Sequence, residues 1–300
     1  MAWALLGALF GAAVVAGLPA PAEAVIAASA EDQLAAAGEA VFPLLTAVAG
    51  DAGEPAGEGF IEGTGTVLFD SYVVTVAHAV TPGLSGRTGA SGRDATSRAV
   101  PARTGAGTTW LVADRSGRRV PLEPLARSSQ ADVAVFRLPA GENLPSLPYP
   151  PGDDTALQMG DAVAILGKDP VAGPLFRPGV VAALRSPLGE TSDAIIAASI
   201  RSRSASIEGA LGPGGPPPAF LISLGLLSGE SGSPILAMRR GGYQLVGLAQ
   251  GTFVGPRQLA WAIRLLPALR SLAQDDPSPG LRSFLARCGA LREDNRGPGR

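Results

Sequence analysis

The chain has 300 residues, of which 46% are hydrophobic and 17% charged, and its formal net charge is −2. This length allows one large domain or two small ones, and the composition excludes a disordered acidic chain and a basic nucleic-acid-binding protein. Charge alone indicates no class of partner. The single cysteine, Cys288, excludes an internal disulfide framework and a cysteine-rich zinc site, so we expect no metal and no catalytic role for this thiol.

The N-terminal segment is strongly apolar. Residues 2–18 contain no charged side chain, and a small-x-small pattern that ends at Ala24 follows them. This pattern is typical of a secretory signal, and the run is short for a membrane-spanning helix. No Lys or Arg precedes it, so an uncleaved anchor is the alternative. We expect residues 1–24 to be the signal peptide or anchor, residues 25–56 to be a lead segment, and the protein to be periplasmic or secreted in a bacterium.

The predicted elements change character at Phe60. Before it, residues 31–50 are rich in alanine and leucine and predict either a short helix before Pro43 or the lead into a first strand. After it, short β-branched runs separated by turn residues predict an all-β protein and not βαβ units. The expected strands are the nine runs GTGTVLF, YVVTVA, TTWLVAD, DVAVFRL, AVAILG, GVVAAL, AFLISL, SPILAM and YQLVGLAQ. Nine short strands over roughly two hundred residues suit two barrels.

Proline and glycine mark the boundaries between these elements. The proline-rich stretch 138–154 is expected to separate two barrels, at about residues 57–145 and 155–262. Residues 81–98 and 201–218 are expected to be surface loops, since they are crowded with turn formers.

The C-terminal part predicts helices. The run LAWAIRLLPALRSLAQ predicts a strand that feeds a C-terminal helix, and PGLRSFLARCGALRED predicts a second helix or a frayed tail. We therefore expect one domain over residues 57–272, followed by a partly helical tail over residues 273–300.

Three residues are candidates for a serine-hydrolase site. His78 is the only histidine and ends the apolar run YVVTVAHAV, Asp132 begins an otherwise apolar strand, and Ser231 lies between glycines in LLSGESGSPILA. Each has a plain structural explanation on its own: a solvated histidine, a strand cap and a polar turn. Together they supply the base, the orienting carboxylate and the nucleophile that serine catalysis needs. Because they lie far apart in the sequence, only the tertiary fold can bring them together.

The chain order His, Asp, Ser distinguishes two serine-hydrolase folds. An α/β-hydrolase runs Ser, Asp, His and carries its serine in Gly-x-Ser-x-Gly on a strand-to-helix turn. Here Gly232 follows Ser231 directly, so that motif does not match.

Three sequence blocks instead resemble those of the chymotrypsin-like, trypsin-fold serine proteases. GTGTVLFDSYVVTVAHAV, ADVAVFRL and GESGSPIL are similar to the family's histidine, aspartate and serine blocks, and they stand in the family's order. The resemblance is to the bacterial secreted members and to the protease domain of the periplasmic high-temperature-requirement family in particular. It covers about residues 57–272 and implies two packed six-stranded antiparallel β-barrels with a C-terminal helix.

The resemblance also implies a role for each candidate residue. His78 is then the general base and later the acid, Asp132 orients it, and Ser231 is the nucleophile. The backbone N–H groups of Gly229 and Ser231 form the oxyanion hole, and a glycine at position 229 suits the strained turn that aims its amide.

The resemblance also implies the position of a specificity pocket. Its floor falls at Gly225 and its wall at Gln250, Gly251 and Thr252. No acid lies at the floor and the chain has no second histidine, so cleavage after Lys, Arg or Glu is not expected. The implied P1 residue is small or medium-sized and apolar.

Glu230 departs from the family pattern. Animal members carry an aspartate there that pairs with a newly cut N-terminus, whereas the longer glutamate here could reach an internal partner. The amine of a processed chain stays the alternative partner.

These observations predict an exported serine endopeptidase that cleaves proteins or peptides without a cofactor. No nucleic-acid partner is expected, and membrane contact is expected only if the N-terminal segment is retained. The alternative is a trypsin-fold binding or scaffold protein whose catalysis is vestigial.

Overall fold

The computed structural model describes residues 30–47, 60–80, 108–112, 117–128, 131–169, 173–184, 219–239, 242–252, 259–275 and 278–291. The expected signal or anchor and the two expected surface loops lie outside these residues. The domain boundaries predicted from the sequence therefore stay predictions.

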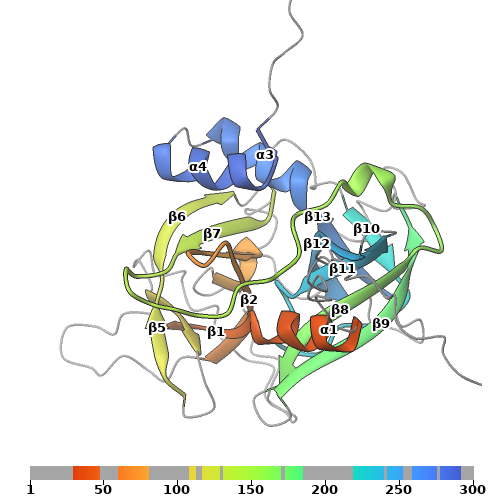
Figure 1. Ribbon diagram of the computed structural model, residues 1–300, viewed down its shortest axis with the longest axis horizontal. Helices are drawn as coiled ribbons and strands as arrows, with labels where there is room; N and C mark the ends of the chain where they lie inside the picture. The colour runs from red at the N-terminus through yellow and green to blue at the C-terminus, as the bar shows by residue number, and fades with distance from the viewer. Residues whose placement is uncertain are drawn as a thin grey trace, which may run out of the picture.

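The described strands form two antiparallel sheets, one in each half of the molecule (Figure 1). The first half contains β1 (Val41–Ala47), β2 (Phe60–Leu68), β3 (Tyr72–Thr75), β4 (Thr108–Val112), β5 (Arg119–Pro121), β6 (Glu123–Ser128) and β7 (Val133–Arg137). Their order is β5-β4-β1-β2-β3-β7-β6. The second half contains β8 (Ala162–Asp169), β9 (Gly173–Ala183), β10 (Ala219–Ile222), β11 (Pro234–Arg239), β12 (Gly242–Thr252) and β13 (Ala260–Arg264). These close into a barrel in the order β10-β13-β12-β11-β8-β9.

The all-β class is confirmed, and the second half is the expected six-stranded barrel. The first half differs, because it is a seven-stranded sheet and no ladder joins β5 to β6 among the described residues. The sequence did not indicate β5 and β6. β5 has only three residues, too few to show a period, and β6 is an edge strand whose side chains are mostly exposed or half-buried and do not alternate.

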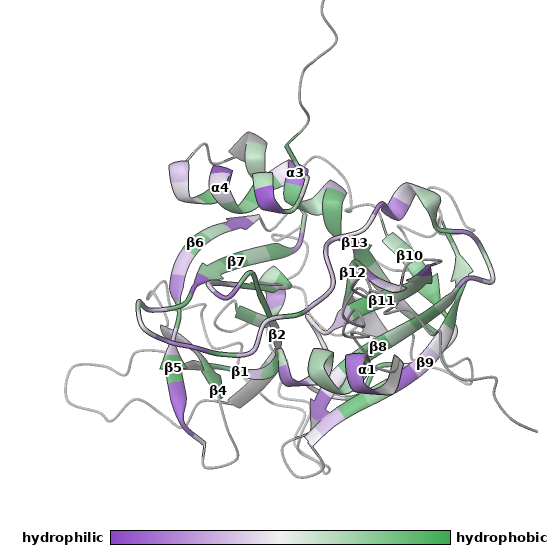
Figure 2. Cartoon of the chain, viewed as in Figure 1, coloured by the Kyte–Doolittle hydropathy of each residue, from purple (hydrophilic) through white to green (hydrophobic). Residues whose placement is uncertain are grey.

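Three groups of buried side chains hold this arrangement, and Figure 2 shows hydrophobic residues along the strands of both halves. One group fills the first sheet around Phe42 and Leu111, and another fills the barrel around Phe220 and Ile235. The third lies between the halves, where strands from both contribute. β3 and β7 therefore bury successive residues on both faces and read as continuous apolar runs.

Helices pack against both sheets. α1 (Ala30–Glu39) packs on β8 and β9 and leads into β1, so the N-terminal stretch forms both the helix and the strand that were alternatives. Pro43 is tolerated in β1 because it pairs only with β2, while the ladder to β4 begins at the next residue. α3 (Leu265–Asp275) follows β13 directly, as expected, and α4 (Pro279–Arg287) lies beside it.

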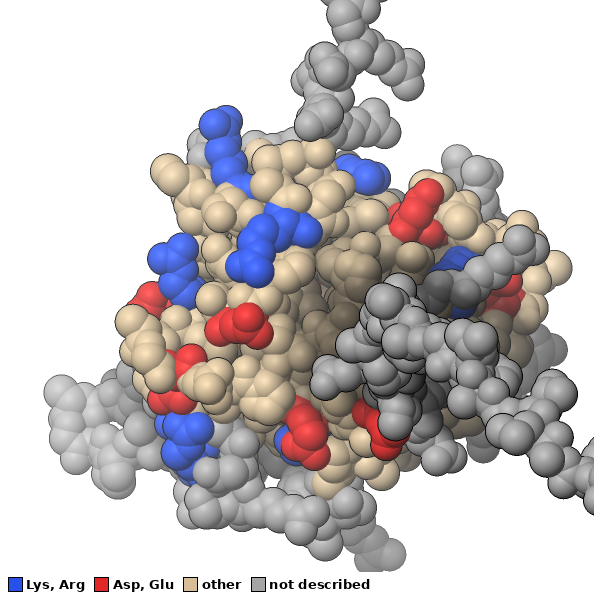
Figure 3. Space-filling model, viewed as in Figure 1, with Lys and Arg blue, Asp and Glu red and all other residues tan. Residues whose placement is uncertain are grey.

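The connecting segments include two short 3₁₀ helices, η1 (Ala77–Val80) after β3 and η2 (Asp154–Ala156) between the halves. Charged side chains of both signs are scattered over the face in Figure 3, with large uncharged areas between them. None of the helices in the described ranges has the length and apolar character needed to cross a membrane.

Candidate active site

His78 and Asp132 meet because their strands are neighbours. β3 ends just before η1, which carries His78, and β7 begins just after Asp132; Thr75 and Ala134 pair across the two strands. Asp132 has a φ of 48°, a left-handed conformation that aspartate adopts more readily than most residues. Its Oδ1 accepts a hydrogen bond from the His78 backbone N–H at 2.9 Å, and its Oδ2 lies 2.8 Å from His78 Nδ1. The carboxylate thus fixes both the backbone and the ring of the histidine.

The electrostatics of this pair favour a protonated imidazole. Burial alone lowers the pKa of His78, but the charge of Asp132 and its hydrogen bond outweigh burial and raise the pKa above its ordinary value of 6.5. The His78 side chain is 34% exposed and that of Asp132 only 8%. The ring therefore has one edge on a buried carboxylate and another available to a reacting group.

Ser231 lies in a tight turn anchored on β2. The Thr64 N–H donates to the Ser231 carbonyl at 2.7 Å, and the Thr64 hydroxyl donates to the Gly229 carbonyl at 2.7 Å. Gly229 and Gly232 have φ values of 87° and 90°, which glycine alone adopts freely. Both carbonyls are thus engaged, while no hydrogen bond in the described part of the chain uses the backbone N–H of Gly229 or Ser231.

Gln250 connects the serine to the carboxylate. Its Nε2 donates to Asp132 Oδ2 at 2.7 Å, and its backbone carbonyl accepts a hydrogen bond from Ser231 Oγ at 3.3 Å. No hydrogen bond joins Ser231 to His78 among the described residues. The structure therefore brings His78, Asp132 and Ser231 to one place, with the serine hydroxyl turned toward Gln250.

Glu230 has an internal partner. Glu230 is 4% exposed, and its carboxylate forms an ion pair with Arg177 Nη1 on β9. The same oxygen, Oε2, also accepts the Leu227 N–H at 2.6 Å. Of the two partners that the sequence left open, the structure shows the internal one.

The expected pocket residues lie around the same turn. A Cβ on Gly225 would lie 3.2 Å from Thr252 Oγ1, so these two expected pocket residues lie close together. A Cβ on Gly251 would lie 2.3 Å from the Trp261 ring, which explains why this position is glycine. The Gln250 side chain is bonded to Asp132 and is not free to act as a simple pocket wall.

Sequence analysis missed Arg177 and the contact of Gln250 with Asp132. Arg177 lies 53 positions from Glu230, and Gln250 lies 118 positions from Asp132. Arg177 is the one charged residue of β9, which is its only local signal, whereas Gln250 shares β12 with other polar residues and gives no signal of its own.

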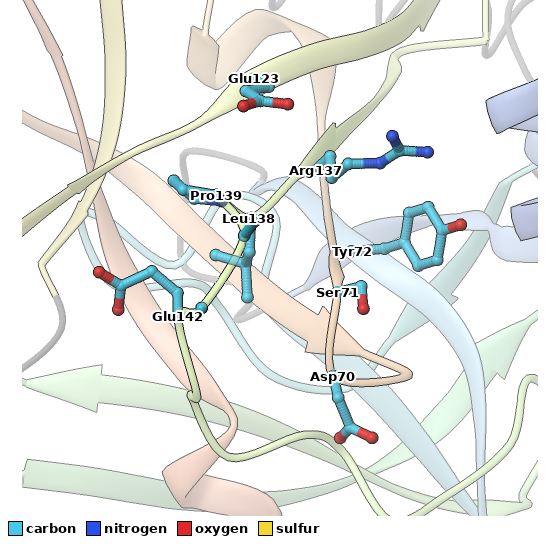
Figure 4. A pocket seen from close by; sticks show the side chains of 10 residues that line it. Asp70, Ser71, Tyr72, Glu123, Arg137, Leu138, Pro139 and Glu142 are labelled. Carbon is cyan, nitrogen blue, oxygen red and sulfur yellow. The ribbon is translucent and has the colours of Figure 1, made fainter.

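A separate cavity of about 420 Å³ lies on the first half. Figure 4 shows Tyr72 and Arg137 extending to the same side of it, with the Arg137 guanidinium 6.0 Å from the Tyr72 ring centre. These residues are at the ends of β3 and β7 opposite to His78 and Asp132, so the cavity is not part of the candidate site. Within the described ranges, no group of three or more His, Cys, Asp or Glu side chains is arranged to hold a metal ion.

Comparisons with known proteins agree with this fold. The chain is similar to two solved structures of the HtrA-type protease AlgW with a tripeptide, one of them a variant. Identity is 16% in both, the TM-scores are 0.53 for the variant and 0.51, and 84% and 81% of this chain are covered. The chain spans 65% and 62% of those two chains, and at this identity the likeness concerns the fold.

No curated protein matches the chain at a significant level. Residues 63–248, more than half of the chain, match the family model described as "Trypsin-like peptidase domain". This range contains His78, Asp132 and Ser231 and most of the strands of both sheets, while β1 and β13 lie outside it. The chain therefore belongs to the trypsin-like peptidase domain family.

Proposed function

We propose that this trypsin-like peptidase is a serine endopeptidase with Ser231 as nucleophile, His78 as general base and Asp132 as the residue that orients it. One observation carries the proposal. The Asp132 carboxylate holds His78 at 2.8 Å and is joined through Gln250 to the Ser231 hydroxyl. The same carboxylate accepts the His78 backbone N–H through Oδ1, and its contacts with the ring and with Gln250 match what a serine nucleophile requires.

The proposed reaction starts with a rotation of Ser231 about χ1, from the Gln250 carbonyl to His78 Nε2. His78 takes the hydroxyl proton as Oγ bonds to the carbonyl carbon of the substrate, and Asp132 stabilises the imidazolium. The free N–H groups of Gly229 and Ser231 hold the oxyanion. His78 then gives the proton to the leaving amine, and a water molecule activated by His78 hydrolyses the acyl-enzyme.

We infer peptide substrates with a small or medium-sized apolar P1 residue. The floor at Gly225 carries no charged side chain, and Thr252 faces it closely. The similar HtrA-type structures are described with a tripeptide, which supports a peptide as the ligand class.

We further propose that the protein is exported, with residues 1–24 as signal peptide, and that it acts in the periplasm or outside the cell. N-terminal sequencing of exported protein is expected to start near Val25. A chain that starts at Met1 and fractionates with membranes would show an anchored peptidase instead.

A fluorophosphonate probe tests the activity directly. The wild-type chain is expected to be labelled on the peptide that contains Ser231, and Ser231→Ala is expected to lose labelling and on the order of 10⁴-fold in peptide hydrolysis. Ser228→Ala is the matched control, because Ser228 is an exposed serine of the same turn. A wild-type chain that binds peptides but takes no label would be the vestigial binding protein.

A further inference from the structure

One arginine joins three segments near the candidate site. Arg177 lies on β9 at a half-buried position, whereas its neighbours Phe176 and Pro178 on the other face of the strand are exposed. Its Nη1 pairs with Glu230 Oε2, and its Nη2 donates to the Gly225 carbonyl at 2.7 Å. The guanidinium thus contacts the residue before the nucleophile and the expected floor of the pocket.

The buried carboxylate of Glu230 needs a positive charge beside it. Glu230 is 4% exposed, and within the described residues its Oε1 has no hydrogen-bond partner. That oxygen also lies against β8, since a Cβ on Gly167 would be 3.2 Å from it. Removing one partner of a buried ion pair leaves the other charge uncompensated, and the carboxylate then has to move toward water. Such a movement would shift the Ser231 turn, because Glu230 directly precedes Ser231.

The planar fork of arginine is what allows both contacts. Its two nitrogens are held at a fixed separation, so Glu230 and Gly225 are kept at a fixed distance from each other. A lysine ammonium carries the same charge but is a single point donor on a flexible stem. It could hold Glu230 or Gly225 but not both in this geometry.

We infer that Arg177 is a positioning residue, which fixes the turn that carries Ser231 relative to the expected pocket floor at Gly225. This inference rests on the proposed peptidase function and deepens it. Arg177 touches neither Ser231 nor the expected position of the scissile bond. Rate and P1 discrimination therefore depend on one side chain that acts only through Glu230 and Gly225.

The test compares Arg177→Ala and Arg177→Lys with Arg239→Ala in the full chain. Arg239 is a matched control, because its side chain is 21% exposed against 25% for Arg177 and it also pairs with a carboxylate, Asp161, in the same barrel. The measurements are the rate of fluorophosphonate labelling, kcat/KM for peptides with Ala, Val, Leu or Phe at P1, and the melting temperature.

Arg177→Ala is expected to stay folded and to lose about 100-fold in labelling rate, the effect of a displacement of about 1 Å at a reacting centre. Ethylguanidinium added to this variant is expected to restore part of the rate, and ethylammonium to restore less. Arg177→Lys is expected to keep more of the rate while its kcat/KM values for the four peptides converge. Arg239→Ala is expected to keep both the rate and the order of preference.

The inference is overturned if Arg177→Lys matches the wild type in labelling rate and P1 preference. It is equally overturned if Arg177→Ala and Arg239→Ala lose labelling rate to the same extent at an equal drop in melting temperature. If Arg177→Ala does not fold, Arg177→Lys and Glu230→Gln take its place, since Glu230→Gln also breaks the ion pair with Arg177. Their labelling rate and P1 preference then test the inference. A wild-type chain that takes no label would instead contradict the proposed function.

Discussion

Gln250 donates its side-chain amide to Asp132 Oδ2, the same oxygen that lies 2.8 Å from His78 Nδ1. The carboxylate is therefore held from two sides, and one of the two donors comes from the other half of the molecule. This bond fixes the position of Asp132 relative to the strand that also accepts the Ser231 hydroxyl.

Replacing Gln250 is expected to change the pH dependence as well as the rate. Gln250→Ala removes one donor from a buried carboxylate and should lower kcat/KM by about 10-fold, the equivalent of one net hydrogen bond to a charged group. Gln250→Glu adds a negative charge beside Asp132, so the pKa of His78 should rise further and the acidic limb of the pH profile should move upward. Gln244→Ala, on the same strand, is the control. An unchanged pH profile in Gln250→Glu would contradict the contact.

The pH profile of the wild type follows from His78. Because its pKa is raised above 6.5 and the neutral imidazole is the base, kcat/KM should rise through an apparent pKa above 6.5. Asp132→Asn should lower both this pKa and kcat/KM, the latter by about 10⁴-fold. Since no other histidine is present in the sequence, the acidic limb of this pH profile reports the ionisation of His78. A profile that is flat between about pH 5 and 8 would exclude His78 as the base.

The free energy of unfolding should also depend on the His78–Asp132 pair, and the direction of its pH dependence follows from the raised pKa of His78. A histidine whose folded pKa is raised stabilises the native state fully below its unfolded pKa, and this contribution is lost as pH rises through the folded pKa. Urea unfolding of the wild type and of His78→Ala should therefore differ most at acidic pH, with the gap closing above neutrality. A gap that widens toward alkaline pH would contradict the assigned direction.

Gly232 is predicted to be irreplaceable for steric reasons as well as for its φ. A Cβ there would lie 2.2 Å from the Thr64 carbonyl oxygen and 2.3 Å from Thr75 Oγ1. Gly232→Ala should therefore destabilise the fold by roughly 2 kcal/mol or more, because a packed backbone has to move. Gly160→Ala separates the two causes. Gly160 has the same φ of 90° but open space around it, so only the backbone cost of about 1 kcal/mol is expected. Chemical denaturation of both variants measures the difference.

Cys288 is predicted to be unreactive in the native protein. It is buried behind α4, and burial raises the pKa of its thiol to about 12. An aromatic disulfide reagent at pH 8 should react with it only after the protein is unfolded. Hydrolysis should be the same with and without a reducing agent. Rapid reaction of the folded chain would show that the C-terminal helices open readily.

The sequence predicted the parts of the site that rest on local patterns. His78 and Asp132 stand at the ends of continuous apolar runs, and those runs are the neighbouring strands β3 and β7. Glycines around Ser231 predicted the tight turn, because only they adopt its φ values freely.

The other parts of the site and fold depend on tertiary contacts, which give no local pattern in the sequence. Arg177 and Gln250 contact partners that lie far away in the sequence, and a polar residue in a strand does not reveal its partner. β6 was missed because an exposed edge strand has no reason to alternate polar and apolar residues. The orientation of the Ser231 hydroxyl toward the Gln250 carbonyl depends on the side-chain rotamer, which no sequence pattern predicts.

The C-terminal helices have a mechanical consequence for a site that is divided between two halves. α3 leaves β13 of the barrel and packs on β6 and β7 of the first sheet, and the Phe284 ring of α4 lies 4.9 Å from that of Tyr72. His78 and Asp132 belong to one half and Ser231 to the other, so in the proposed mechanism any sliding of the halves would separate the proton donor from its acceptor. α3 therefore ties the barrel to the first sheet, and α4 packs beside it on the first sheet. The C-terminal helices thereby help to keep the two halves in one relative position.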